Sequence, residues 1–468
     1  MNRMESLRRH SVDVPLLLGP PAAVVAGSLL LAMGFPWPQA GIGSILVLSI
    51  GLWSSSTLAP PLAGLMVIAL LPVLRVTNFE AAVAGLASGT VWLFLSVSIL
   101  AIALRKVGIV AWVADWVVRL GRGNASRTLL AMMGAILLLT TAVPTAVARS
   151  GLVALLLDGI VAAYGRERED IPRAFALGAA MSVFAFQLSV MTGTNGALYA
   201  VAWFELHGPV SITFGRWLAL MAPLGIIQAL LVWWVLRREY RLDRVRVDRA
   251  TGGQKKLLLS GQQARVLAVF AVLLLVWVLG PWAGLPIHPY TLLFATLLCV
   301  PKVGVLVWED LKEGIPWGTA LLLASAIAVG DAFKQTGMGT VLGAYLTEAM
   351  GGIPDWLVTF AVLLAFLVGR ILFVNLLSLL VTLLPLVASV GQDLGFNPVW
   401  LVLLGLYTGS MGFFLPAQSP VAVTLAAQGD LPLVELSRLG MRLAPLWVAV
   451  LLVSAYTWWP LLGLRPFP

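Results

Sequence analysis

Apolar stretches separated by short polar segments run along almost the whole chain. Stretches of about 20 mainly apolar residues are long enough to cross the hydrocarbon core of a bilayer as helices. We expect helices near residues 13–35, 41–58, 60–74, 90–107, 128–142, 150–164, 172–190, 213–236, 266–283, 289–307, 316–333, 356–374, 376–391, 399–412 and 440–463. Several of these stretches are too short for a full crossing, so the pattern predicts half-spans or re-entrant pieces among the full spans.

The composition supports the same class of protein. Of 468 residues, 60% are hydrophobic and 11% are charged, and the mean hydropathy is +0.96. These values lie far from those of soluble domains and leave no room for a separate soluble domain. We therefore predict an all-α polytopic membrane protein that is surrounded by membrane lipid. Its net charge of +9 sits between the apolar stretches, which argues against nucleic acid as a partner.

Clusters of basic residues predict the orientation of the chain. Arg3, Arg8 and Arg9 lie before the first apolar stretch, and residues 237–265 form the most basic segment. Because cytoplasmic loops are rich in Lys and Arg, we expect both segments on the cytoplasmic side, at a bacterial inner (plasma) membrane. The predicted organisation is an N-terminal cytoplasmic segment and first transmembrane helix at 1–40, a first repeat at 41–236, the basic cytoplasmic loop at 237–265 and a second repeat at 266–468.

Similar landmarks recur in the same order in the two halves. Residues 91–109 and 316–338 are apolar stretches with an early tryptophan, and they end in "ALRKVG" and "AFKQTG". A shorter stretch with aromatic or charged residues follows each and suits the membrane interface. This order predicts an internal repeat, which is common in transporters.

Polar breaks interrupt the apolar sequence in both halves. They read "TTAVPTAVARSG" (140–151), "TGTNG" (192–196), "VNLLSLLVT" (374–382) and "LPAQSP" (415–420). Pro144 removes a backbone donor, so we expect it to break a membrane helix whose resumed part offers its N-terminal end. Irregular backbone at membrane depth lines protein or a wet cavity. Because helix N-termini attract anions and free carbonyls attract cations, the breaks predict a site for an anion and a coupling cation.

The candidate substrate-binding residues come from these breaks. They are Thr145, Arg149, Ser150, Thr192, Gly193, Thr194, Asn195, Asn375, Ser378, Gln418, Ser419 and Pro420. Each has a structural alternative: Arg149 as a snorkelling or paired residue, the hydroxyls as interhelical hydrogen-bond partners, and the Gly and Pro segments as plain turns. The sequence has no HExxH, no GxSxG and no acid-rich motif, so we expect no enzyme and no catalytic residue.

At these residues the chain resembles the divalent anion:sodium symporter family, over roughly residues 45–460. "WLFLSVSILAIALRKVGI" is similar to the family's scaffold helix, and "PTAVARSG" is similar to its Pro-Ser-Asn-Thr-Ala-Arg-Ser-Gly signature. Ala146 and Val147 stand where that signature has asparagine and threonine. "TGTNGA" and "LPAQSPVA" resemble the hairpin-tip loops of the family, with Ala197 and Ala422 in place of asparagine.

The resemblance implies both a fold and a function. The implied fold has two inverted repeats, each with scaffold helices, a broken helix and a re-entrant hairpin, and it forms a homodimer. The implied function is secondary active transport of a di- or tricarboxylate or a sulfate-like dianion by an elevator-type mechanism coupled to sodium or protons. Sodium sites are implied near Pro144, Thr145, Thr194, Asn375 and Ser419. An ion exchanger or an oxyanion efflux permease of the same superfamily is the alternative.

Overall fold

A computed structural model shows how the chain folds. It describes residues 13–467 except 56, 165–169, 208–211, 247–258, 350–351, 374–375, 415–420, 422–423 and 427–430. Within these ranges the chain is helical, and the one pairing of strand type is an isolated bridge between Asn124 and Arg246. The predicted all-α fold is therefore confirmed.

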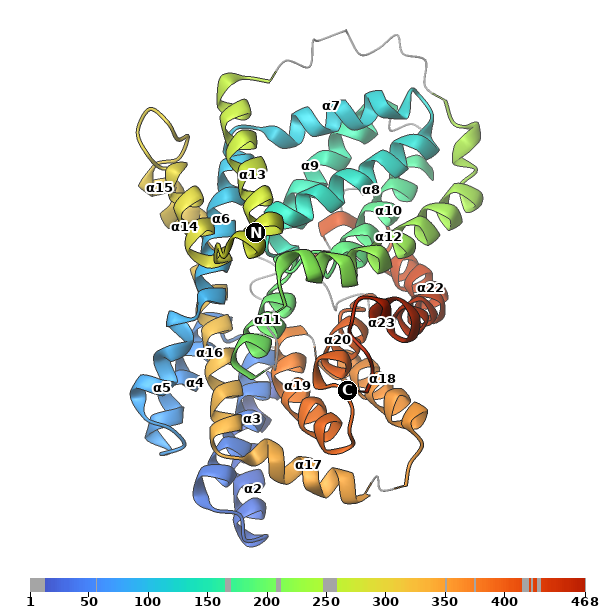
Figure 1. The fold of residues 1–468 in the computed structure, drawn as a ribbon. Helices are drawn as coiled ribbons and strands as arrows, with labels where there is room; N and C mark the ends of the chain where they lie inside the picture. Colours follow the sequence, from blue (N-terminus) through green and yellow to red (C-terminus); the bar gives the residue numbers. More distant parts are fainter. Residues whose placement is uncertain are drawn as a thin grey trace.

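The helices of the first half are, in order, α2 (Val14–Ala32), α3 (Trp37–Ser54), α4 (Pro60–Val73), α5 (Phe79–Val83), η1 (Ala84–Ala87), α6 (Gly89–Lys106), α7 (Ile109–Gly121), α8 (Ala125–Ala142), α9 (Ala146–Tyr164), α10 (Asp170–Phe186), α11 (Asn195–His207), α12 (Phe214–Glu239) and η2 (Leu242–Arg244). The helices that follow the basic segment are α13 (Gly261–Leu279), η4 (Gly280–Ala283), α14 (Ile287–Leu297), α15 (Trp308–Gly314), α16 (Trp317–Gln335), α17 (Met338–Ala349), α18 (Asp355–Leu372), α19 (Leu376–Asp393), α20 (Pro398–Gly409), α22 (Leu433–Val453), η5 (Ser454–Trp458) and α23 (Trp459–Leu461). Figure 1 shows their arrangement.

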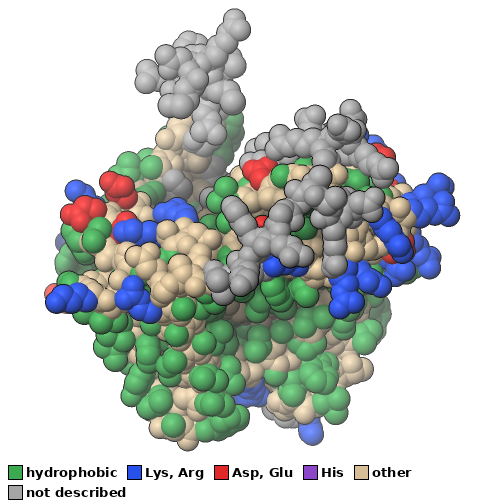
Figure 2. Space-filling model, turned by 90° about the horizontal axis from the view of Figure 1, so that it is seen from above, with side chains coloured by type: hydrophobic (Ala, Val, Ile, Leu, Met, Phe, Trp, Pro, Cys, Tyr) green, Lys and Arg blue, Asp and Glu red, His purple; other side chains and the backbone are tan. Residues whose placement is uncertain are grey.

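Many of these helices have the length and composition of membrane spans. Seven described helical segments are long and apolar enough to cross a bilayer, and the bent pair of α15 and α16 raises the number to eight. Large hydrophobic side chains are exposed on helices such as α2 and α13, where a soluble protein would carry polar ones. Figure 2 shows Lys and Arg side chains gathered in a band on one face of the molecule, with hydrophobic side chains filling the area below them.

Helices α6 and α16 end in the same way, as the matching sequences predicted. The amide of Val107 donates to the carbonyl of Ala103, and the amide of Thr336 donates to that of Ala332. Gly108 and Gly337 follow with φ of 68° and 70°, a left-handed conformation that favours glycine. Each glycine starts a helix, α7 or α17, that runs crosswise to the preceding one, and the two crosswise helices lie at opposite ends of the molecule (Figure 1).

The structure assigns hairpin and broken helix the other way round from the sequence interpretation. Thr128 near the start of α8 and Tyr164 at the end of α9 share a hydrogen bond of 2.5 Å, and α7 packs across both helices. Helices α8 and α9 are thus the arms of a hairpin, and residues 143–145 form its tip. In contrast, α10 packs on α8, α9 and α12 while α11 packs on α6, α16 and α19, so residues 187–194 interrupt a helix that continues.

The reason for this difference is physical. A proline removes one helix hydrogen bond whether the chain then continues or turns back, so Pro144 alone does not decide between a break and a hairpin. The outer ends of α8 and α9 decide it, because both must pack under the same crosswise helix.

Candidate functional site

The candidate site lies where the tip of the α8–α9 hairpin meets the break between α10 and α11. Arg149, in the first turns of α9, is fully buried at 0% exposure. Its Nη1 donates to the carbonyl of Val143 at 3.0 Å, in the tip, and to the carbonyl of Gly193 at 2.8 Å, in the break. One guanidinium therefore joins the two irregular segments that the sequence had marked separately.

The electrostatics of Arg149 set it apart from the rest of the core. A guanidinium stays charged at neutral pH, and burying an uncompensated charge is costly. Its Nε and Nη2 atoms have no hydrogen-bond partner among the described residues, and no described carboxylate forms an ion pair with it. The guanidinium is thus a buried positive charge with N–H groups that no described residue accepts. Such a group suits an anion that offers two neighbouring oxygen atoms.

Gly193 allows the break to pack closely on the last turn of α8. A Cβ at Gly193 would lie 2.5 Å from the carbonyl oxygen of Gln187 and 2.9 Å from Cγ2 of Thr140. The neighbouring Thr192 donates to the carbonyl of Thr141 at 3.3 Å. The break is therefore packed directly on the last turn of α8, and only glycine fits at its centre.

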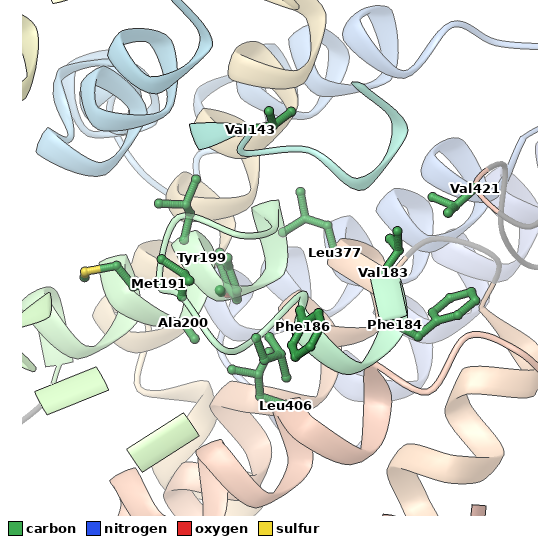
Figure 3. Packing of buried hydrophobic residues seen from close by; sticks show 14 of the residues in the cluster. Val143, Val183, Phe184, Phe186, Met191, Tyr199, Ala200, Leu377, Leu406 and Val421 are labelled. Carbon is green, nitrogen blue, oxygen red and sulfur yellow. The ribbon is translucent and has the colours of Figure 1, made fainter. Parts of the chain in front are cut away.

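The break of the first half also contacts the second half. Nε2 of Gln187 donates to the carbonyl of Ser410, at the end of α20, at 2.7 Å. Figure 3 shows side chains from the α8–α9 tip (Val143), the break (Met191), α19 (Leu377) and α20 (Leu406) in one region of the core. Segments more than 200 residues apart thus form a single centre.

Arg370 is a second buried arginine, in the second half, and our sequence analysis missed it. It lies in the last turn of α18, is 5% exposed, and its Nη1 donates to the carbonyl of Phe373 at 2.6 Å. A Cβ on Gly412 would lie 2.6 Å from its Nη2, so the guanidinium rests on the backbone just after α20. The signal was present, because Arg370 is the only charged residue between Asp355 and Asp393.

The remaining candidates of the first half divide between the site and local structure. Thr145 accepts from the amide of Ala148 at 3.1 Å and so caps α9. Thr194 contacts the Asn195 amide oxygen at 3.2 Å, and Ser150 is buried at 2% exposure. The structure therefore brings all of these residues to the tip or the break, although several also have a structural role.

The second-half candidates are only partly described. Ser378 is buried at 1% exposure near the start of α19, and its hydroxyl has no hydrogen-bond partner within the described ranges. Ser378 lies in the first turn of α19, and its place in the binding site stays a prediction. Asn375, Gln418, Ser419 and Pro420 lie outside the described residues.

A small cavity lies beside the α8–α9 tip. It has a volume of about 50 Å³ and is bounded by Pro144, Thr145 and Ala148 on the hairpin and by Ser98 and Arg105 on α6. Arg149 points away from it, into the break. The predicted residues of this segment thus face two directions: Thr145 faces the cavity, and Arg149 faces the buried centre.

Comparisons with known proteins agree with this architecture. A membrane protein of Cupriavidus necator is 27% identical over 354 residues, which cover 73% of this chain and 68% of the relative. The sodium-dependent dicarboxylate transporter SdcS of Staphylococcus saprophyticus is 24% identical over 95% of this chain and 90% of its own. The crystal structure of the Alcanivorax borkumensis YdaH transporter matches with a TM-score of 0.57 at 16% identity, covering 87% of this chain and all of that one.

The family model described as "Sodium:sulfate symporter transmembrane region" matches residues 28–465, which include the hairpins, the breaks and both crosswise helices. A match over this much of the chain is far more specific than the short, altered signatures. The chain belongs to the divalent anion:sodium symporter family, a family of membrane transporters.

Proposed function

We propose that the chain is a secondary active transporter that moves a small dianion, either a di- or tricarboxylate or a sulfate-like oxyanion. The observation that carries the proposal is the buried Arg149, with donors that no described residue uses, at the junction of tip and break. A carboxylate or sulfate at this point neutralises the charge and accepts the free N–H groups. The dianion is thus both the cargo and the counter-ion of the site.

The rest of the binding site follows from the same elements. The first turn of α9 offers backbone N–H groups and the positive end of its dipole. Thr145, Ser150, Thr192, Thr194 and Asn195 supply hydroxyl and amide groups around it. Gly193 and Ser378 complete the described part of the site, and Asn375, Gln418, Ser419 and Pro420 are its proposed partners outside the described residues.

We further propose an elevator-type mechanism built on two inverted repeats. Its support is the matching ends of α6 and α16 and the opposite placement of α7 and α17 (Figure 1). The repeats would be 41–236 and 266–468, in a homodimer in a bacterial inner membrane. The end that carries α7 is placed in the cytoplasm, since the basic residues at the end of α12 and in η2 lie there, joined to Asn124.

The coupling ion is part of the same proposal. The carbonyls of Val143 and Gly193 each accept a hydrogen bond from the positively charged Arg149, which makes them poorer ligands for a sodium ion near Pro144, Thr145 or Thr194. Ala146, Val147 and Ala197 offer no oxygen atoms on their side chains. Because side-chain oxygen ligands for sodium are few here, we keep coupling to protons as well as coupling to sodium in the proposal. The same lack of ligands supports an exchanger or oxyanion efflux permease as the second candidate.

Uptake into proteoliposomes tests the proposal. We expect the purified protein to accumulate at least one member of a panel of succinate, citrate, sulfate and arsenite under an imposed sodium or proton gradient. A dependence on sodium alone selects the symporter, whereas uptake driven only by an opposed proton gradient selects the exchanger. Failure to transport any member of the panel under any gradient contradicts the proposed function.

A further inference from the structure

Two cavities outside the buried centre each contain one exposed basic side chain from a long, early-tryptophan helix. The cavity beside the α8–α9 tip includes Arg105 of α6. A second cavity, of about 170 Å³, includes Lys334 of α16 together with Thr340, Ser389 and Gln392. Arg105 and Lys334 are both exposed, so each cavity has its basic residue at the surface of the protein.

Arg105 and Lys334 occupy the same position in the two helix ends. The amide of Gly108 donates to the carbonyl of Arg105 at 3.1 Å, and the amide of Gly337 donates to that of Lys334 at 2.9 Å. Each basic residue therefore lies three positions before a left-handed glycine and a crosswise helix. Because α7 and α17 lie at opposite ends of the molecule (Figure 1), the two cations lie toward opposite ends as well.

Each cavity also places its cation beside side chains of a neighbouring helix. Arg105 shares its cavity with Pro144, Thr145 and Ala148 of the α8–α9 hairpin, and Lys334 shares its cavity with Pro385, Ser389 and Gln392 of α19. Hydroxyl groups of Ser98 and Thr145 line the first cavity beside the cation, and those of Thr340 and Ser389, with the Gln392 amide, line the second. This combination suits a small oxyanion on its way to the buried centre.

The neighbouring charges differ between the two cavities. Lys106, the residue beside Arg105, pairs with Asp310 of α15, and no described carboxylate forms an ion pair with Arg105. Lys334 donates to the carbonyl of Leu206 at 3.3 Å, and the carboxylate of Asp331 lies one turn earlier on α16, where it interacts with Lys334. The positive charge is thus less compensated at Arg105 than at Lys334.

We propose that Arg105 and Lys334 form two anion-recruiting subsites, one at each end of the transport pathway, which hold a small carboxylate or sulfate before it reaches the buried centre. The inference rests on the proposed function and extends it to how the anion enters from either side. A positively charged side chain at a helix C-terminus also stabilises the helix through its dipole. Loss of that stabilisation changes transport equally in both directions. Dependence on the side of the membrane therefore separates the two roles.

The test measures transport from each side in proteoliposomes of determined orientation. Arg105→Gln is expected to raise KM roughly threefold or more for anion presented at the α7 end, to weaken the salt dependence there, and to leave the opposite side within about twofold. Lys334→Gln is expected to do the reverse, with the smaller effect because of Asp331. Arg127→Gln removes an exposed charge at the α7 end outside the cavity and serves as the control.

The outcomes separate the inference from the function on which it rests. Equal changes of KM on both sides, or no change in either variant, overturn the two subsites while wild-type transport continues. An effect of Arg127→Gln equal to that of Arg105→Gln also overturns them, because a general surface potential then explains the result. Absence of wild-type transport for every anion of the panel overturns the proposed function itself.

Discussion

At the scale of single residues, the site depends on how closely backbone and guanidinium approach each other. Arg149 reaches two carbonyls, in the tip and in the break, and Gly193 lets that break pack closely against Thr140 in the last turn of α8. The composition of the stretch indicated that Arg149 is unusual. It did not indicate that the acceptors of Arg149 are carbonyls, since one of them, Gly193, lies in a separate segment that only the fold brings close.

Gly193→Ala tests this packing. We expect loss of transport and a stability lower by about 1–3 kcal/mol, because the new Cβ meets the Gln187 carbonyl and Thr140. Gly134→Ala is the matched control: a Cβ there, inside α8, has no neighbour within 4 Å, so it is expected to leave stability equal or slightly higher. Thermal unfolding in detergent measures both, and equal melting temperatures for the two variants contradict the account.

At the scale of elements, the sequence pattern predicted the helices and the matching ends of α6 and α16. It did not decide which polar break is a hairpin tip and which interrupts a helix. The ends of α6 and α16, with their glycines and crosswise helices, follow from matching sequences, because a left-handed glycine is a local requirement. Hairpin and broken helix were exchanged because both need the same proline, glycine and polar residues. Contacts of Thr128 with Tyr164, and of α7 with both arms, are non-local and decide between them.

The link between the break of the first half and the end of α20 makes a second prediction. Gln187→Leu removes the bond to the Ser410 carbonyl and is expected to cost roughly 1 kcal/mol of stability, but to reduce transport strongly, because it uncouples the two centre segments. Gln39→Leu removes a similar bond, from an amide to the Thr336 carbonyl between α3 and α16, and is expected to keep transport. Equal transport losses in both variants contradict a special role for the break.

At the scale of the whole molecule, the distribution of basic residues predicts the orientation of the chain in the membrane, which the pattern of apolar residues does not. Basic residues gather at the end of α12 and in η2, near the start of α8. From the positive-inside rule we predict that the α7 end lies in the cytoplasm and the α17 end outside. The basic segments of the sequence predict this orientation directly, whereas the packing of α8 on α9 becomes visible only in the folded structure.

Cysteine labelling in intact cells tests the orientation. Cys299 is the only cysteine, so Cys299→Ser gives a background without thiols. In it, Glu348→Cys at the end of α17 is expected to react with an impermeant maleimide, and Arg122→Cys after α7 only after lysis. Both positions are exposed. The opposite pattern reverses the proposed orientation.

Solute counterflow with wild type and Arg149→Gln measures directly whether the buried arginine binds the transported anion. Counterflow needs no driving gradient, so it tests the site independently of the coupling ion. We predict that proteoliposomes with wild-type protein, loaded with unlabelled dianion, transiently accumulate the labelled dianion. Proteoliposomes with Arg149→Gln protein, whose folding is checked by size exclusion and thermal unfolding, are predicted not to do so. Counterflow at the wild-type rate in folded Arg149→Gln protein would contradict the claim that this buried arginine binds the transported anion.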